Sequence, residues 1–140
     1  MRAMVLASLL LALVAGCDGD RVAPPRQDMQ IITDLIAVIG RADGDWSAYV
    51  ARAKALQAIG HIKIDDLSAA GYHAYMVTYA PGSDAPAYEW ITLDREYIGR
   101  DPCLGAQTLV HELAHLITHT YAHQWAVDTV EAQFKVDCNG

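Results

Sequence analysis

Two segments in the first half of the chain have apolar residues at the spacing of a helix that buries one face. Residues 28–40 begin with Asp28, which can cap a helix, and end with a glycine that can stop it. Residues 45–60 repeat this arrangement, with Asp45 as the cap. The apolar positions of the second segment are Trp46, Tyr49, Val50, Ala53, Leu56 and Ile59. The pattern predicts two helices that pack against a core.

Strand-forming residues dominate the two segments that follow. Residues 72–80 (YHAYMVTYA) and 87–93 (AYEWITL) are rich in β-branched and aromatic residues, and the turn-forming run PGSDAP separates them. This arrangement predicts an antiparallel hairpin. The next residues, 94–102 (DREYIGRDP), are expected to form a loop that leads into the next helix.

A long amphipathic helix is predicted from Asp101 to His123. Asp101 can cap this helix, and Pro102 can occupy its first position. One half of the helical wheel is apolar apart from Thr120, and contains Leu109, Val110, Leu113, Ala114, Leu116, Ile117 and Tyr121. The other half carries His111, Glu112, His115, His119 and His123. Such a helix packs its apolar side on a core and turns its polar side toward a cleft.

These elements predict one small domain of the α+β class. It would comprise two N-terminal helices, a short antiparallel sheet, the long helix and a final returning helix within residues 127–137. The apolar positions of the returning helix are Ala126, Val127, Val130 and Phe134. A chain of 140 residues leaves room for one domain, here residues 28–140.

The N-terminus has the features of an export signal. Arg2 precedes an uninterrupted apolar stretch from Ala3 to Ala15, which is shorter than the roughly 20 residues of a membrane-spanning helix. The run Val14-Ala15-Gly16-Cys17 resembles the bacterial lipobox, in which the cysteine is acylated and becomes the new N-terminus. This resemblance implies a bacterial lipoprotein.

The lipoprotein resemblance implies that residues 1–16 are removed and that Cys17 carries a lipid anchor. Acyl chains contribute about 0.8 kcal/mol per buried methylene, so the anchor would hold the domain at a membrane surface outside the cytoplasm. Asp18 resembles the inner-membrane retention signal of enterobacterial lipoproteins, and the cell surface is the other location considered. Residues 18–27 (DGDRVAPPRQ) are expected to be a flexible tether.

The net charge limits the classes of partner, and the cysteine content indicates the redox state of the compartment. Without Arg2 the mature chain has 9 basic and 17 acidic residues, a formal charge of −8, which argues against nucleic acid as a partner. With Cys17 acylated, Cys103 and Cys138 remain, and a disulfide between them is expected in an oxidising compartment. It would close a loop around the long helix and stabilise the fold by roughly 3 to 4 kcal/mol. Two buried free thiols are the alternative.

The long helix contains the pattern His-Glu-x-x-His at residues 111–115. Residues four apart lie one turn apart on the same helix face, so His111 and His115 can take adjacent corners of a zinc tetrahedron. Glu112 lies near enough to remove a proton from a zinc-bound water, which makes a nucleophile for a polarised carbonyl. The pattern therefore predicts a site for one zinc ion per chain.

A third protein ligand is expected from beyond the long helix. On a continuous helix His119 lies about 12 Å from His111 along the axis, and His123 would need a sharp bend for which no glycine is present. An antiparallel helix that starts near His123 would return Glu131 to the level of His115, so Glu131 is the predicted ligand. Asp128 is the alternative ligand or a partner for a zinc-bound histidine, and both carboxylates could also be solvated surface groups.

The motif residues His111, Glu112 and His115, with Glu131, resemble the zincin metallopeptidases and within them the gluzincins. The resemblance covers residues 88–137 and implies a zinc peptidase in which a glutamate on a following helix completes the site. It also implies that an edge strand beside the metal binds an extended peptide substrate, a role expected for residues 87–93. The gap between His115 and Glu131 and the whole domain are short for such enzymes.

A hydrogen-bond donor for the transition state is expected as well, and His119 and His123 are preferred over Tyr121. The leading hypothesis is a membrane-tethered zinc peptidase. A non-catalytic metal carrier, with His119 and His123 as a second metal-binding pair, is the second hypothesis. A zincin-like binding module is the third.

Overall fold

The computed structural model describes residues 25–138, so the predicted signal, Cys17, Asp18 and most of the predicted tether lie outside the described residues. The helices and strands, in chain order, are α2 (Arg26–Gly40), α3 (Ser47–Ala58), β1 (Ile62–Asp65), β2 (Ala74–Thr78), β3 (Glu89–Asp94), α4 (Arg95–Arg100), α5 (Pro102–Thr118) and α6 (His123–Trp125). Short 3₁₀ turns cover Ser68–Ala70 and Pro86–Tyr88, and a π-helix, η3 (Ala126–Glu131), continues α6. The α+β class predicted from the sequence is confirmed.

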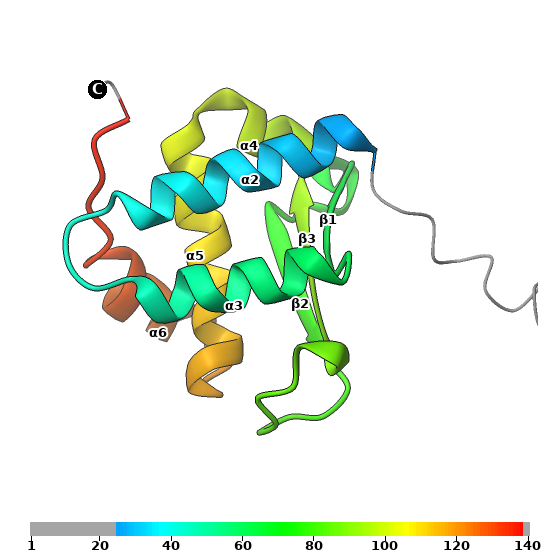
Figure 1. Ribbon diagram of the computed structural model, residues 1–140, viewed down its shortest axis with the longest axis vertical. Helices are drawn as coiled ribbons and strands as arrows, with labels where there is room; N and C mark the ends of the chain where they lie inside the picture. Colours follow the sequence, from blue (N-terminus) through cyan, green and yellow to red (C-terminus); the bar gives the residue numbers. More distant parts are fainter. Residues whose placement is uncertain (1–24, 139–140) are drawn as a thin grey trace, which may run out of the picture.

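The long helix α5 is the element on which the others pack. It contacts α2, α3 and α4, the strands β2 and β3, and η3 (Figure 1). The middle of its apolar side is fully buried, with Leu109, Val110 and Leu113 at 0% exposure, and Ile117 near its end is partly buried. Ile32, Ile39, Leu56, Ile62, Ile91 and Leu93 complete the centre of the core from the surrounding helices and the sheet.

The described sheet has three strands in the order β1-β3-β2. The predicted hairpin is confirmed, since β2 pairs antiparallel with β3, with Met76 opposite Ile91. Strand β1, which was not predicted, pairs parallel with the other side of β3. The expectation that residues 87–93 form an edge strand is therefore wrong. The burial of nearly every side chain in β3 agrees with its central place.

Two acidic residues that were predicted to cap helices have different roles. Helix α2 begins at Arg26, two residues before Asp28, and the carbonyl of Pro25 accepts the first helical hydrogen bond from the N–H of Met29. The side chain of Asp28 is buried and forms a two-bond ion pair with Arg95, at 2.8 and 3.0 Å. Asp45 lies two residues before α3 and accepts hydrogen bonds from the backbone N–H and hydroxyl of Ser47. Gly60, with φ of 73°, follows the end of α3 as predicted.

The segment predicted to be a loop after β3 is largely helical. Asp94 caps α4 by accepting a hydrogen bond from the backbone N–H of Tyr97. Asp94 also accepts from the backbone N–H of Leu67 at 2.7 Å and from the hydroxyl of Ser68. Burial alone would raise the pKa of Asp94, but these hydrogen bonds together lower it below the usual value.

The start of α5 agrees with the prediction. Asp101 accepts a hydrogen bond from the backbone N–H of Cys103, and Pro102 occupies the first helical position. Cys103 and Cys138 form a disulfide, with their Cα atoms 5.8 Å apart. This bond joins the first turn of α5 to the C-terminal segment. Within residues 25–138, every helix is too short or too polar to cross a membrane.

Replacement of Asp94 by alanine is expected to destabilise the fold by about 2 kcal/mol at neutral pH, because the cap is lost and the Leu67 N–H is left buried without an acceptor. The folded-state pKa of Asp94 is lowered, so its stabilisation is present above about pH 4 and is lost as pH falls through the folded-state pKa. Chemical denaturation of wild type and Asp94→Ala at pH 7 and pH 3 measures both effects. Asp66→Asn, an exposed aspartate nearby, is the control and should change little.

Candidate metal centre

The two histidines of the motif face each other inside the fold. His111 and His115 lie one turn apart on α5 and are 5% and 6% exposed. Their Nε2 atoms are 3.1 Å apart. Two nitrogen ligands that each lie about 2.0 to 2.1 Å from a tetrahedral zinc ion are about 3.3 Å apart. The observed separation is therefore close to what a shared zinc ion requires.

The other ring nitrogen of each histidine contacts a hydrogen-bond acceptor. Nδ1 of His111 lies 2.6 Å from a carboxylate oxygen of Glu131. Nδ1 of His115 lies 2.6 Å from the backbone carbonyl oxygen of Thr120. A carbonyl and a carboxylate only accept hydrogen bonds, so both Nδ1 atoms must carry the proton. In the neutral histidines, each Nε2 atom then presents a lone pair.

Two lone pairs that face each other at 3.1 Å need a cation or a proton between them. A proton would leave one of the two buried histidines charged. Burial lowers the pKa of His111 below its usual value, against the attraction of Glu131, and the neighbouring His115 and His123 lower it further. The neutral form is thus favoured, and a divalent metal ion fits the donor pair better than a proton does.

Helix α5 ends earlier than the sequence predicts. It stops at Thr118, and His119 adopts the left-handed conformation with φ of 55°. The prediction that the helix continues to His123 is therefore wrong, as is the premise that only glycine permits the bend. Histidine is among the residues that enter this region more often than most, together with asparagine and aspartate. The reversal turns the carbonyl of Thr120 back onto His115.

This reversal brings His123 beside the motif. The rings of His123 and His111 have their centroids 4.8 Å apart, and His123 is exposed at the start of α6. The nitrogen atoms of His111, His115 and His123 do not all lie within 4.8 Å of one another. A contact from His123 to a metal ion held by the other two would need rotation about its side-chain bonds, which its exposure allows.

The two carboxylates considered as third ligands occupy different places. Glu131, at the last position of η3, contacts Nδ1 of His111, on the side of the ring that faces away from His115. There it orients His111 and raises the basicity of its Nε2 atom. Asp128 is exposed and accepts a hydrogen bond from Gln124, so the structure does not bring it to the histidines. The returning helix is a π-helix that ends at Glu131, six residues before the predicted end.

Glu112 lies between the histidines in sequence and is 8% exposed. Burial raises its pKa to about 7, and the negative charge of Glu131 contributes to the rise. Its carboxyl group makes no hydrogen bond or ion pair with another described residue. A buried carboxyl group with a pKa near neutrality and free oxygen atoms is suited to accept and return a proton.

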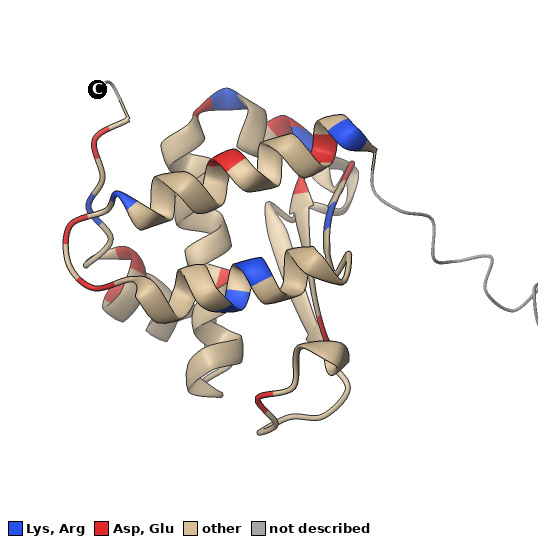
Figure 2. Cartoon of the chain, viewed as in Figure 1, with Lys and Arg blue, Asp and Glu red and all other residues tan. Residues whose placement is uncertain are grey.

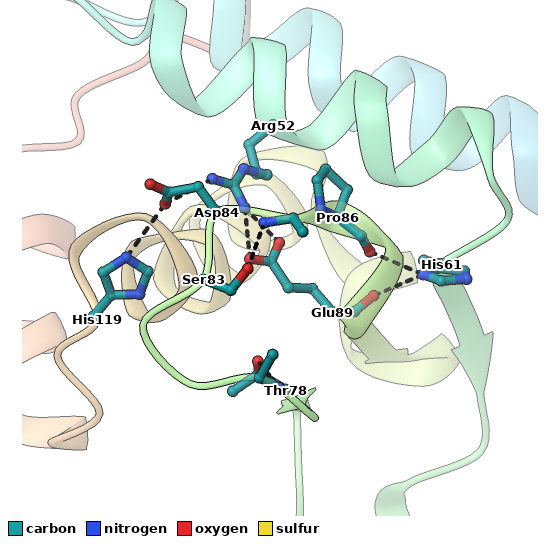
Figure 3. Close-up of polar contacts among 10 residues, drawn as sticks. Arg52, His61, Thr78, Ser83, Asp84, Pro86, Glu89 and His119 are labelled. Carbon is teal, nitrogen blue, oxygen red and sulfur yellow. Dashed lines mark hydrogen bonds and ion pairs between the residues drawn. The ribbon is translucent and has the colours of Figure 1, made fainter.

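A chain of ion pairs holds the β2–β3 loop against the end of α5 (Figure 3). His119 Nε2 lies 3.2 Å from Asp84, and Asp84 lies 3.3 Å from Arg52. Arg52 also contacts both carboxylate oxygens of Glu89 at 2.6 Å, and Glu89 is 1% exposed. His119 is thus turned to the loop, and because α5 ends at Thr118, His119 and His123 do not share the continuous helix on which the pair expected for a metal carrier depended. Tyr121 is exposed.

One other group of potential ligands lies close together in the part of the chain that the structure describes. It consists of Asp101, Cys103 and Cys138, whose ligand atoms lie within 4.8 Å of one another. The two sulfur atoms are bonded to each other, and Asp101 caps α5. These atoms are therefore engaged in structural bonds and are not free to hold a metal ion.

The spacing of His111, Glu112 and His115 was recognised in the sequence, and His123 was named there only as a transition-state donor or as part of a second metal-binding pair. The contact of the Thr120 carbonyl and the Arg52–Asp84 ion pair were not predicted. The carbonyl of Thr120 carries no sequence signal, because any residue supplies a carbonyl. The approach of His123 depends on where α5 ends, and the polar run His119-Thr120 inside the apolar pattern was the available signal. The partners Arg52 and Asp84 lie 32 residues apart and show no local pattern.

Neither a family model, nor a curated protein, nor a solved structure matches this chain. The geometry of the site is therefore the basis on which a function can be assigned.

Replacement of Arg52 by methionine is expected to cost about 3 kcal/mol of stability, because it leaves the buried carboxylate of Glu89 without its partner. Lys54→Met removes the same charge from an exposed position on the same helix and should change stability by less than about 0.5 kcal/mol. Urea denaturation of both variants measures the difference. Equal effects would show that the Arg52–Glu89 pair contributes no more than a surface charge.

Proposed function

We propose that this protein is a zinc-dependent peptidase that hydrolyses peptide bonds outside the cytoplasm. The observation that carries the proposal is the pair of Nε2 lone pairs, 3.1 Å apart, whose Nδ1 atoms are both engaged by acceptors. A buried carboxyl group with a raised pKa follows the first histidine directly. A metal-binding pair next to a proton acceptor supports hydrolysis better than storage or transport of the ion.

His111 and His115 would hold one zinc ion, and His123 is the third ligand that we propose. Glu131 would act through His111, since it contacts the nitrogen that points away from the ligand pair. Zinc, when bound there, would lower the pKa of a coordinated water and polarise the carbonyl of the peptide bond. This ligand set replaces the expectation that Glu131 itself binds the metal.

Glu112 would serve as the general base. Its carboxyl group would take a proton from the attacking water and later deliver a proton to the amine that leaves. Its burial and its lack of bonding partners keep it available for both transfers. His119 is held by Asp84, so it could donate to the oxyanion only after that contact breaks, and His123, as a proposed zinc ligand, would not be the donor.

The peptide would bind along β2. The resemblance to zincins implies an edge strand beside the metal, and β2 packs against α5 while its outer side has no strand partner among residues 25–138. An extended peptide can pair with the free N–H and carbonyl groups of such an edge. Strand β3 is already paired on both sides and cannot take this role. A zincin-like fold is part of this proposal.

The lipobox resemblance at residues 14–17 supports a location of this activity at a membrane surface. A lipid on Cys17 would hold the domain close to the bilayer on the periplasmic side of the inner membrane or at the cell surface. The acidic composition suits protein or peptide substrates and argues against nucleic acid.

The catalytic role of Glu112 predicts that Glu112→Gln keeps one zinc ion per chain and lowers peptide hydrolysis by about 100-fold or more. Metal analysis of the purified protein and cleavage of a mixed peptide library measure these two properties. Glu96→Gln, the same change on the exposed helix α4, should retain full activity. Full activity of Glu112→Gln with zinc retained would show that the catalytic assignment is wrong. Bound zinc without hydrolysis in the wild type would favour a non-catalytic metal-binding protein or binding module.

The proposed ligand set predicts an order of zinc affinities that competition with a chromophoric chelator can measure. His123→Ala should weaken zinc binding by more than about 100-fold, while Glu131→Gln should weaken it by about 10- to 100-fold, the range typical of partners of metal ligands. His73→Ala, the same change at an exposed histidine outside the centre, is the matched control and should leave the affinity unchanged. A larger loss for Glu131→Gln than for His123→Ala would instead make Glu131 the ligand.

A further inference from the structure

A cavity that none of the motif histidines line lies where the α2–α3 loop, the end of α5 and the C-terminal helices meet. Its volume is about 360 Å³. It is lined by Asp43, Gly44, Asp45, Trp46, Tyr49, Thr118, Trp125, Thr129, Val130 and Gln133. Three of these residues are aromatic and two are acidic, and none is a lysine or an arginine. Neither the motif nor the proposed zinc ligands are among them.

The aromatic wall at Trp46 is held in place by contacts with two other lining residues and with Phe134. The indole N–H of Trp46 donates a hydrogen bond to the backbone carbonyl of Asp43 at 2.8 Å. Its ring makes edge-to-face contacts with Tyr49 and Phe134, with centroids 5.0 and 5.1 Å apart. Burial raises the pKa of Tyr49, so its phenol remains neutral at physiological pH. The rings thus form a preorganised surface whose faces attract cations.

The charged residues that line this cavity are both acidic. Figure 2 shows acidic residues on the loop that joins α2 to α3, and Asp43 and Asp45 belong to this loop. The carboxylate of Asp45 is engaged by Ser47, whereas that of Asp43 makes no hydrogen bond or ion pair with another described residue. Lys135, which together with Asp43 lines a neighbouring cavity, does not line this one.

The cavity is lined by residues of α5, α6 and η3, the same elements that carry the candidate metal centre. Thr118 follows His115 by three residues on the same side of α5, about 4.5 Å along the axis. Trp125 follows His123 by two residues, and Val130 precedes Glu131. These shared elements make the cavity a candidate subsite for a peptide held at the centre.

We propose that this cavity binds an alkylammonium or guanidinium group, supplied by a lysine or arginine side chain of the peptide substrate. Aromatic faces and an unpaired carboxylate are the two features that recognise such cations, and here they line one cavity. The inference of a substrate subsite rests on the proposed function, whereas binding of the cation itself does not.

The test is a fluorescence titration of the metal-free Trp90→Phe variant, in which the two remaining tryptophans both line the cavity. The probe is N-acetyl-lysine methylamide, and its uncharged counterpart is N-acetyl-norleucine methylamide. We expect saturable binding of the lysine probe, at least about tenfold tighter than that of the norleucine probe. Asp43→Asn should weaken lysine binding about threefold to fivefold, and Asp66→Asn should not. Equal affinity for the two probes, or no saturable signal, would overturn the proposal.

A separate measurement keeps this result apart from the proposed peptidase activity. The wild-type protein with zinc is given a peptide library, and the residues that flank each cleavage are determined. Enrichment of lysine and arginine at one fixed position, reduced in Asp43→Asn, supports the subsite. Binding of the lysine probe without any hydrolysis would leave the cation site standing and reject the peptidase. Hydrolysis with no preference for basic residues would reject the subsite while the peptidase stands.

Discussion

The reversal of the chain at His119 is the constraint on which the geometry of the metal centre depends. Helix α5 supplies His111 and His115, but their orientation comes from residues after the reversal. The carbonyl of Thr120 engages His115, and Glu131 engages His111. Both contacts act on the nitrogen that does not face the partner histidine. A single residue in the left-handed conformation thus determines which nitrogen atoms are available to a metal ion.

Much of the fold could be predicted from local sequence signals such as caps, apolar patterns and turns. Asp101 and Pro102 mark the start of α5, and the apolar stripes of α2 and α3 are long enough to identify both helices. The hairpin of β2 and β3 follows from two strand-forming segments around a turn. In each case the residues that form the element also contain the signal.

The features that the sequence did not reveal depend on partners far along the chain. Strand β1 has four residues and is stabilised by pairing with β3, whose segment lies almost thirty residues later. Asp28 is of a residue type that often caps helices, but its side chain instead pairs with Arg95, which lies 67 residues later in the chain. The end of α5 was missed because the apolar pattern continues through Tyr121. Such positions are determined by tertiary contacts, which override local preference.

The disulfide has a practical consequence for how the domain can be attached to other molecules. Cys138 is bonded to the first turn of α5, whereas His115 lies twelve residues further along the same helix. That separation corresponds to about 18 Å of helix. Cys138 therefore lies at the end of α5 that is remote from the histidines. A fusion partner or surface linkage introduced there would leave the approach to the metal centre unobstructed.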